Sequence, residues 1–536
     1  MTAFRSPRHR FTPRVRIPSR VELSLKRGAA DLSGALFSLS PLPSIAVFAL
    51  CVLLLVSFTS LQQNADGLLL AIMSLQKPTV YYWGADRYGI LTALLAVWIR
   101  NPTLNMYSQI LIQLCAGLTA PLFFCSMILR RASDAWRAAL LSDCLMILFG
   151  SGTMMKQLFV GASPYGTSLA CAGLATIALR ATSGRLGGVL LKLLGAALLV
   201  TAYIVNFGLV IIALPLVGLF ALVVPSVHST RLLVLHGLAA VVGYLLPRIL
   251  VPDFHTSLSL QISFANMTRY AAVVWNVTGW WLMSATLLPA VALILYLWLA
   301  RRHRPAILVL ILVAAIVGVA IFNFDVIASS RWLVMNRFHV RYIVPDYLLL
   351  MSIGGLSLWL AAKFMLRSAT ARSVVFAGLT ALLLLAAFVR QHGHRADNSN
   401  IIADDRRDLA RAVAEQYVAH SLDGIAARGR SNGYWDVWPA VFLTEQYHYD
   451  SGYGGPNVIG ITGRGEVRRP EFAARLATQG RLRLACIDLD PTECAVTVAM
   501  VMATAGLHAT EFSPAQQLPG NHRLVFVEIN PAGPKQ

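Results

Sequence analysis

The stretch AILVLILVAAIVGVAIFN, residues 306–323, contains no charged residue and lies just after the basic run Arg301, Arg302, His303 and Arg304. As a helix rising about 1.5 Å per residue, it covers most of a hydrocarbon core that is about 30 Å thick. Uninterrupted apolar runs with a basic segment at one end are typical of helices that cross a membrane. The stretch therefore predicts a membrane-spanning helix.

The rest of the 536-residue chain repeats this pattern. Hydrophobic residues make up 57% of it and charged residues only 13%, whereas about a quarter of a soluble protein is charged. Apolar runs recur from Ile45 to Val389, with short basic segments between them. We predict an all-α polytopic membrane protein with about eleven spans. These are residues 44–60, 106–129, 138–155, 166–179, 187–204, 207–225, 232–250, 282–300, 306–323, 343–362 and 373–389.

The apolar segment 90–99 is left out of this set. As a helix it covers about 15 Å, half of what a span needs, so we predict a helix lying at the membrane surface. With this choice the inner loops carry more Lys and Arg than the outer loops, as the positive-inside rule requires. A twelfth span would instead place Arg130, Arg131 and Arg301 outside. The N-terminus is then cytoplasmic and the tail lies outside.

The formal net charge of +20 would suit nucleic acid, but the basic residues lie mostly at the ends of the predicted spans. Eight precede the first span: Arg5, Arg8, Arg10, Arg14, Arg16, Arg20, Lys26 and Arg27. Such a cluster is typical of a cytoplasmic anchor beside anionic lipid, and no small-residue cleavage site follows the first apolar run. We expect membrane lipid, and no nucleic acid, as a partner.

The pattern predicts three parts: a basic cytoplasmic segment 1–43, a transmembrane domain 44–390 with an outer loop at 61–105, and a periplasmic domain 391–536 of a bacterial inner-membrane protein. In the last part, helical patterns at 404–420, 470–478 and 492–505 alternate with apolar runs at 458–461, 482–487 and 524–529. This alternation predicts a small soluble α/β domain. Cys486 and Cys494 lie in it, and their spacing leaves open whether they pair.

Outer segments 61–105, 251–281 and 324–342 are too long and too polar to be simple turns, and function is expected on them. Asp66 follows the first span by a few residues, so the bilayer fixes its height at the outer surface. A carboxylate there suits a general base that takes a proton from an acceptor hydroxyl. The alternative is that Asp66 only caps the helix that follows.

Further along the same loop, Tyr81, Tyr82 and Trp83 precede Asp86 and Arg87. Aromatic rings at this height either stack on a sugar or lie among the lipid headgroups. Asp86 is a candidate second catalytic or metal-contacting acid, or else the partner of Arg87 in a local ion pair. Tyr82, Trp83 and Arg87 are candidate substrate-binding residues.

This loop resembles that of the GT-C superfamily of membrane glycosyltransferases, which use polyprenyl-phosphate sugars. Members have an acidic residue soon after the first span, a long outer loop with surface helices, and often an outer C-terminal domain. Asp66 falls at the place of that acid, and Tyr82 to Gly89 match the pattern ahead of the surface helix. Many members have adjacent acids where this chain has one, which leaves open whether a divalent cation takes part.

The third outer segment contains Arg331, Arg337 and Arg341, against the general charge bias. A guanidinium group can donate two parallel hydrogen bonds to a phosphate, so these arginines are candidates for binding a lipid phosphate; the alternative is that they extend to outer headgroups. Lys156, at the outer end of a span, is a further candidate. In the tail, 433–438 and 447–449 combine aromatic rings and acids, typical either of a carbohydrate-binding surface or of a core packed on the spans.

The residues and the resemblance together predict a glycosyltransferase that moves a sugar from a polyprenyl-phosphate donor to a lipid, polysaccharide or protein acceptor at the outer face. The alternative is a transporter or flippase for a lipid-linked or small polar substrate. A transporter is expected to show halves related by a repeat, and the sequence shows no such repeat.

Overall fold

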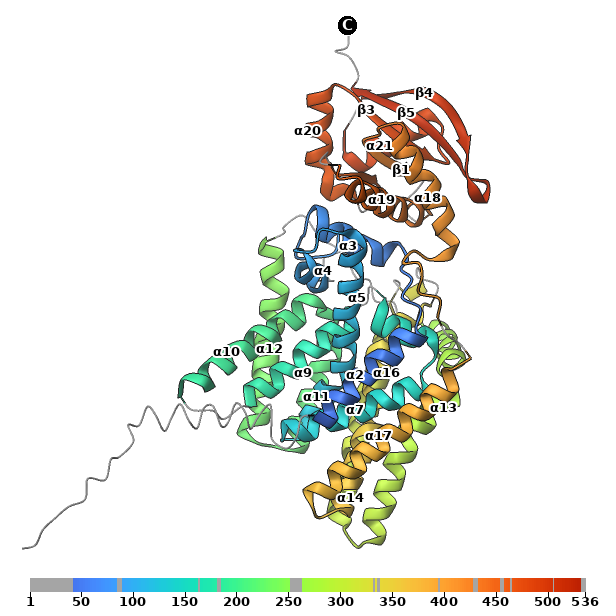
Figure 1. Ribbon diagram of the computed structural model, residues 1–536. Helices are drawn as coiled ribbons and strands as arrows, with labels where there is room; N and C mark the ends of the chain where they lie inside the picture. The colour runs from blue at the N-terminus through green and yellow to red at the C-terminus, as the bar shows by residue number, and fades with distance from the viewer. Residues whose placement is uncertain are drawn as a thin grey trace, which may run out of the picture.

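The computed structural model describes residues 42–83, 89–161, 164–180, 185–250, 263–330, 333–334, 338–393, 396–427, 432–453, 457–462, 465–504 and 506–531. A long helical part carries a compact C-terminal domain at one end (Figure 1). The helical part consists of α2 (Leu42–Phe58), α3 (Ala65–Gln76), α4 (Leu91–Ala96), α5 (Pro102–Thr119), α6 (Pro121–Ile128), α7 (Ala132–Phe149), α8 (Gly152–Met155), η1 (Lys156–Val160), α9 (Tyr165–Arg180), α10 (Arg185–Val205), η2 (Phe207–Leu209), α11 (Val210–Val223), α12 (Val227–Leu250), α13 (Phe264–Leu299), α14 (His303–Ala328), η3 (Val340–Ile343), α16 (Val344–Met365) and α17 (Ala369–Gln391).

The predicted spans fall on these helices, and 106–129, 138–155 and 207–225 each extend over two consecutive elements. Within the described ranges, six stretches are long and apolar enough to cross a membrane: Pro102–Ile128, Gly187–Val205, Ser229–Ile249, His303–Ala328, Val340–Met365 and Ala369–Gln391. Two bent pairs raise the number to eight if each is one span. Of the remaining predicted spans, α2 and α11 are shorter apolar helices, and α7 carries Asp134, Arg137 and Asp143. The chain is a multi-pass membrane protein, and the full count of eleven stays a prediction.

The segment 90–99 contains only the six-residue helix α4, which is too short to span a bilayer, as predicted. Together with α3 it lies at the end of the helical part that faces the C-terminal domain (Figure 1). In the second predicted outer segment, the chain is helical from Phe264 onward. This part of α13 meets the span Met283–Leu299 at 79°, with a break at Gly279, whose φ of +62° favours glycine.

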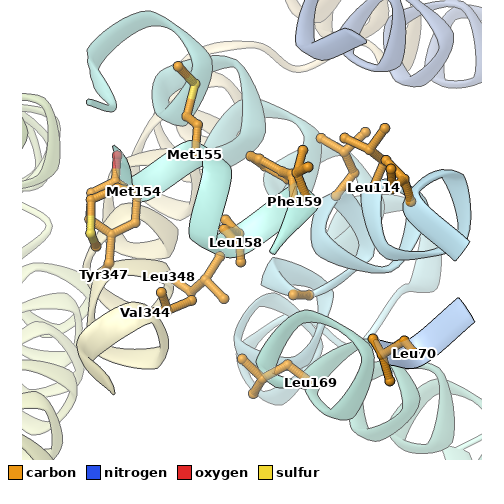
Figure 2. Packing of buried hydrophobic residues seen from close by; sticks show 14 of the residues in the cluster. Leu70, Leu114, Met154, Met155, Leu158, Phe159, Leu169, Val344, Tyr347 and Leu348 are labelled. Carbon is orange, nitrogen blue, oxygen red and sulfur yellow. The ribbon is translucent and has the colours of Figure 1, made fainter. Parts of the chain in front are cut away.

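A buried apolar core holds the start of α16 in place. Figure 2 shows Val344 and Leu348 of α16 beside Leu158 of η1, while Phe159 of the same short π-helix points toward Leu114 of α5. These side chains are at most 3% exposed. Because such close packing leaves little free space, it fixes the position of each helix relative to its neighbours. The residues that precede α16 are therefore fixed relative to the helices beneath the C-terminal domain.

The C-terminal domain is an α/β unit, as predicted. It consists of α18 (Asp404–Ala419), β1 (Gly424–Ala427), α19 (Asn432–Asp450), β2 (Ile459–Ile461), η4 (Gly465–Arg468), α20 (Arg469–Gln479), β3 (Leu482–Ile487), α21 (Pro491–Met502), β4 (Leu507–Gln517), η5 (Pro519–Asn521) and β5 (Arg523–Pro531). The sheet order is β2-β1-β3-β5-β4, with β1 parallel to β2 and β3 and the other pairs antiparallel.

The two faces of this sheet have different partners. α18 and α19 cover one face, and α20 and α21 cover the other. A disulfide joins Cys486 of β3 to Cys494 of α21, which settles the pairing that spacing alone left open. Because α19 packs on α3 as well as on the sheet, the domain is seated directly on the first outer loop.

Candidate active site

Asp66 lies in the first turn of α3, close beyond α2. The cap of this helix is Asn64, whose side chain accepts a hydrogen bond from the Gly67 amide at 3.3 Å. The interpretation of Asp66 as the capping residue is therefore wrong, because the helix begins at Ala65, two residues earlier than a cap at Asp66 requires. Its carboxylate is 18% exposed and is directed to partners from other parts of the chain.

Among the described residues, one side chain from the same outer loop and two from distant segments contact Asp66. The Tyr434 hydroxyl donates to Oδ1 of Asp66 at 2.6 Å, and Nη1 of Arg341 donates to Oδ2 at 3.3 Å. The Tyr82 hydroxyl lies 2.9 Å from the Asp66 carbonyl oxygen and 2.8 Å from the Tyr434 hydroxyl. The first outer loop, the segment before α16 and the C-terminal domain thus meet at one acid.

Arg341 approaches Asp66 from η3, the short turn that leads into α16. Its Nη2 donates to the Tyr342 hydroxyl at 2.9 Å, and its guanidinium carbon lies 5.0 Å from the centre of the Tyr342 ring. Its side chain is 31% exposed. The group is thus oriented by neighbours while part of it still reaches solvent.

The side chain of His339 contacts the backbone of this turn. Its Nδ1 accepts a hydrogen bond from the Arg341 amide at 3.1 Å. Burial, followed by the positive charge of Arg341, lowers the pKa of the His339 imidazole, while Asp66 acts in the opposite direction. A neutral imidazole can accept this hydrogen bond, so His339 positions the Arg341 backbone near neutral pH.

The other predicted site residues are placed less centrally or are outside the described residues. Trp83 is only 1% exposed, and its ring packs edge-on against Trp438 at 5.9 Å. Lys156 begins η1 and is half-buried, with no described contact to Asp66. The predicted site residues Asp86, Arg87, Arg331 and Arg337 lie outside the described residues.

No group of three or more His, Cys, Asp or Glu side chains able to hold a metal ion occurs among the residues that the structure describes. Within the described part of the chain, the Asp66 carboxylate is brought together with the Arg341 guanidinium group and the phenols of Tyr82, Tyr342 and Tyr434. Such a set can accept a proton and bind an anion.

Tyr434 is the site residue that the sequence did not assign. Its segment, 433–438, was expected to be either a carbohydrate-binding surface or a core packed on the spans. The structure favours the core, because Tyr434 is 6% exposed and Trp438 is fully buried. The contact with Asp66 joins residues 368 positions apart, and local sequence patterns do not predict contacts over such a separation.

No protein-family model matches the chain, and no curated protein matches its sequence. Solved structures do match its fold over most of its length. The fold is similar to that of ArnT. The apo structure of ArnT from Cupriavidus metallidurans shares 14% identity, covers 92% of this chain and 98% of that chain, and gives a TM-score of 0.45. The structure of the same protein bound to undecaprenyl phosphate shares 13% identity, covers 92% of this chain and 99% of that chain, and gives a TM-score of 0.46.

The arabinofuranosyltransferase AftD from Mycobacteria is also similar, at 14% identity and a TM-score of 0.45. The match covers 93% of this chain and 40% of AftD. These similarities describe how the chain is arranged. At such identities they concern the fold alone, so the chemistry has to be argued from the site itself.

Proposed function

We propose that this chain is a membrane glycosyltransferase that moves a sugar from a polyprenyl-phosphate donor to an acceptor hydroxyl at the outer face of a bacterial inner membrane. The observation that carries the proposal is the pair of Asp66 and Arg341, 3.3 Å apart. It places a candidate base beside a candidate phosphate-binding cation, just beyond α2 and just before α16. A donor anchored in the bilayer by its lipid would present its phosphate at this height.

The reaction needs one proton acceptor and one site for a leaving anion. Asp66 takes the proton of the acceptor hydroxyl while that oxygen forms a bond to the anomeric carbon of the donor sugar. The bond between this carbon and the phosphate oxygen breaks, and the electron pair leaves with the polyprenyl phosphate. Arg341 stabilises the departing phosphate through its guanidinium group.

Arg341 has the capacity for both partners. A guanidinium group carries five N–H donors, and the described contacts with Asp66 and Tyr342 use one each. Because the side chain is 31% exposed, an anion can approach the guanidinium group. A lysine could not hold a carboxylate and a phosphate in the same planar geometry.

The disulfide supports the proposed side of the membrane. Disulfides persist in oxidising compartments such as the bacterial periplasm and are rare in the cytosol. Cys486 and Cys494 lie in the domain whose Tyr434 contacts Asp66. The domain and the site thus belong to one compartment, and the disulfide and the distribution of basic residues both support the proposal that it is the outer one.

Asp66→Asn tests the proposal. Purified protein in detergent is given a panel of synthetic polyprenyl-phosphate sugars, and release of polyprenyl phosphate is measured by chromatography. We expect the unaltered chain to consume one donor and Asp66→Asn to be about 100-fold to 10,000-fold slower, the range that a general base contributes.

The matched control is Asp134→Asn, which alters another acid in the first turn of a helix, α7. It is expected to retain transfer. Full activity of Asp66→Asn at normal membrane abundance would remove Asp66 as the base, and the absence of release from every donor would remove the proposed reaction class.

A transporter is the second candidate, because two apolar helix pairs are bent by 62° and 79°. Broken helices are a feature of many transporters. Vesicles containing the purified chain and a fluorescent polyprenyl-phosphate sugar distinguish the two: movement of the label across the bilayer without release of polyprenyl phosphate favours transport.

A further inference from the structure

We infer that the C-terminal domain contributes to the active site, and that Tyr434 is the positioning residue through which the domain orients the Asp66 carboxylate. This inference rests on the proposed function and deepens it. Three separate contacts tie the domain to α3, the helix that carries Asp66, or to the residue just before its cap.

The contact at Asp66 has a defined direction. A phenol has a single proton, and the 2.6 Å separation between Tyr434 and Oδ1 is typical of a charge-assisted hydrogen bond. The Tyr82 hydroxyl lies 2.8 Å from that of Tyr434 and forms a hydrogen bond with it. Tyr434 therefore fixes the carboxylate oxygen that it contacts.

A second tie lies at the other end of α3. The side chain of Gln76, its last residue, donates to Oε1 of Glu445 at 2.6 Å and accepts from Arg468. Oε1 of Glu445 also accepts from the Val458 amide at 2.8 Å. Gln76 is thus held between α19 and η4 of the C-terminal domain.

The spacing of these two ties shows that α3 and α19 run side by side. Asp66 and Gln76 are ten residues apart on α3, and their partners Tyr434 and Glu445 are eleven apart on α19. At about 1.5 Å per residue these intervals are roughly 15 Å and 16 Å, so the two helices match in direction and in length. Figure 1 shows α19 lying over α3. A shift of the domain would therefore move Tyr434 relative to Asp66.

A third tie precedes α3. The Gln63 amide donates to the Ile401 carbonyl at 2.6 Å, and the Ala403 amide donates to the Gln63 carbonyl at 3.0 Å. The connection from α17 to α18 thus pairs with the segment just before Asp66. The C-terminal part of the chain contacts α3 before its start, in its first turn and at its end.

The Gln76–Glu445 contact gives the inference a test at a distance from the chemistry. Burial raises the pKa of the Glu445 carboxyl, because it disfavours the charged form. Glu445→Gln keeps an acceptor oxygen for Gln76 and the Val458 amide, whereas Glu445→Ala removes it. The two variants separate the hydrogen bond from the charge.

The experiment measures kcat and KM for the donor that the unaltered chain consumes. Tyr434→Phe is expected to lower kcat about 10-fold to 100-fold, the effect of a lost hydrogen bond to a charged group, with the donor KM nearly unchanged. Tyr417→Phe, which alters a buried tyrosine of the same domain on α18, is the matched control and should leave kcat unchanged.

Glu445→Ala should lower kcat as Tyr434→Phe does, Glu445→Gln should restore it, and the double variant Tyr434→Phe with Glu445→Ala should be no slower than the slower single variant. If Glu445→Ala is lost from the membrane, Gln76→Ala removes the same contact from the other side. A normal or raised kcat in Tyr434→Phe overturns the inference. A double variant whose loss of kcat equals the product of the two single losses also overturns it. If Asp66→Asn is inactive in those cases, the proposed function still stands; if Asp66→Asn is active, both fail.

Discussion

The two ends of α16 each form an ion pair with an acid in the first turn of another helix, and the two pairs differ in a revealing way. At one end, Arg341 pairs with Asp66 of α3. At the other, Lys363 in the last turn pairs with Asp134 of α7 at 2.8 Å. The two basic residues are 22 positions apart, or about 33 Å along a helix.

The pair at the Lys363 end is explained by structure alone. A cation in the last turn of a helix and an acid in the first turn of its neighbour both complement the helix dipoles. Nearby, Arg137 packs on the Trp359 ring at 5.2 Å and donates to the Ser373 hydroxyl at 3.2 Å. These contacts join α7, α16 and α17.

At the Arg341 end, Asp66 in the first turn of α3 also complements the helix dipole, but the position of Arg341 does not. Arg341 lies before the start of α16, where the helix dipole disfavours a cation, and on the side predicted to be outside, where basic residues are fewer. Its acid also contacts Tyr82 of the same outer loop and Tyr434 of the C-terminal domain. An ion pair maintained against these preferences indicates function, whereas the pair at Lys363 indicates stability.

Removing the two cations should separate these roles most clearly. Arg341→Ala loses hydrogen bonds to both a carboxylate and the donor phosphate, each worth about 1.5–3 kcal/mol, so kcat/KM should fall at least about 100-fold. Lys363→Ala should change it less than about threefold. Donor consumption by the two purified variants checks this, and equal losses would contradict the distinction.

Exchanging the cation type sharpens the comparison. Arg341→Lys keeps the charge but loses the planar pair of donors, so kcat/KM should fall roughly 10-fold. Lys363→Arg keeps a cation beside Asp134 and should leave activity unchanged. Full activity in Arg341→Lys would mean that only the charge at this position matters, and the proposed phosphate geometry would be wrong.

The smallest effect is expected at the structural end. Asp134 and Lys363 are 12% and 32% exposed, so loss of this pair in Asp134→Asn should cost about 1 kcal/mol or less. The apparent midpoint of thermal unfolding in detergent should fall by about 2–4 °C, with transfer retained. A loss of activity without a loss of stability would show that this end also takes part in the reaction.

The parts of the molecule that the sequence predicts are those that hydrophobic patterning determines. The predicted spans fall on helices because an apolar run in a bilayer has few alternatives. Asp66 is predicted as a site residue because its distance from a span fixes its height, and Arg341 because an arginine on the outer side can bind a phosphate. The structure brings the two together.

The remaining parts depend on contacts between distant segments or on weak local patterns. Tyr434 becomes a site residue only because α19 packs on α3. β1, Gly424–Ala427, is too short to give a pattern, and β4, Leu507–Gln517, is an edge strand rich in polar residues. The sequence defines the start of α3 only to within one or two residues, so it allows Asp66 as a cap. In the structure the capping residue is Asn64.

The account requires the Asp66 end of α16 and the C-terminal domain to lie outside, and the Lys363 end to lie inside. Alkaline phosphatase, active only after export, tests this most directly when fused after Gln536 in one protein and after Arg372, beyond α16, in another. We predict high phosphatase activity for the first fusion and little for the second at equal abundance. The opposite result would place the site in the cytoplasm and contradict the account.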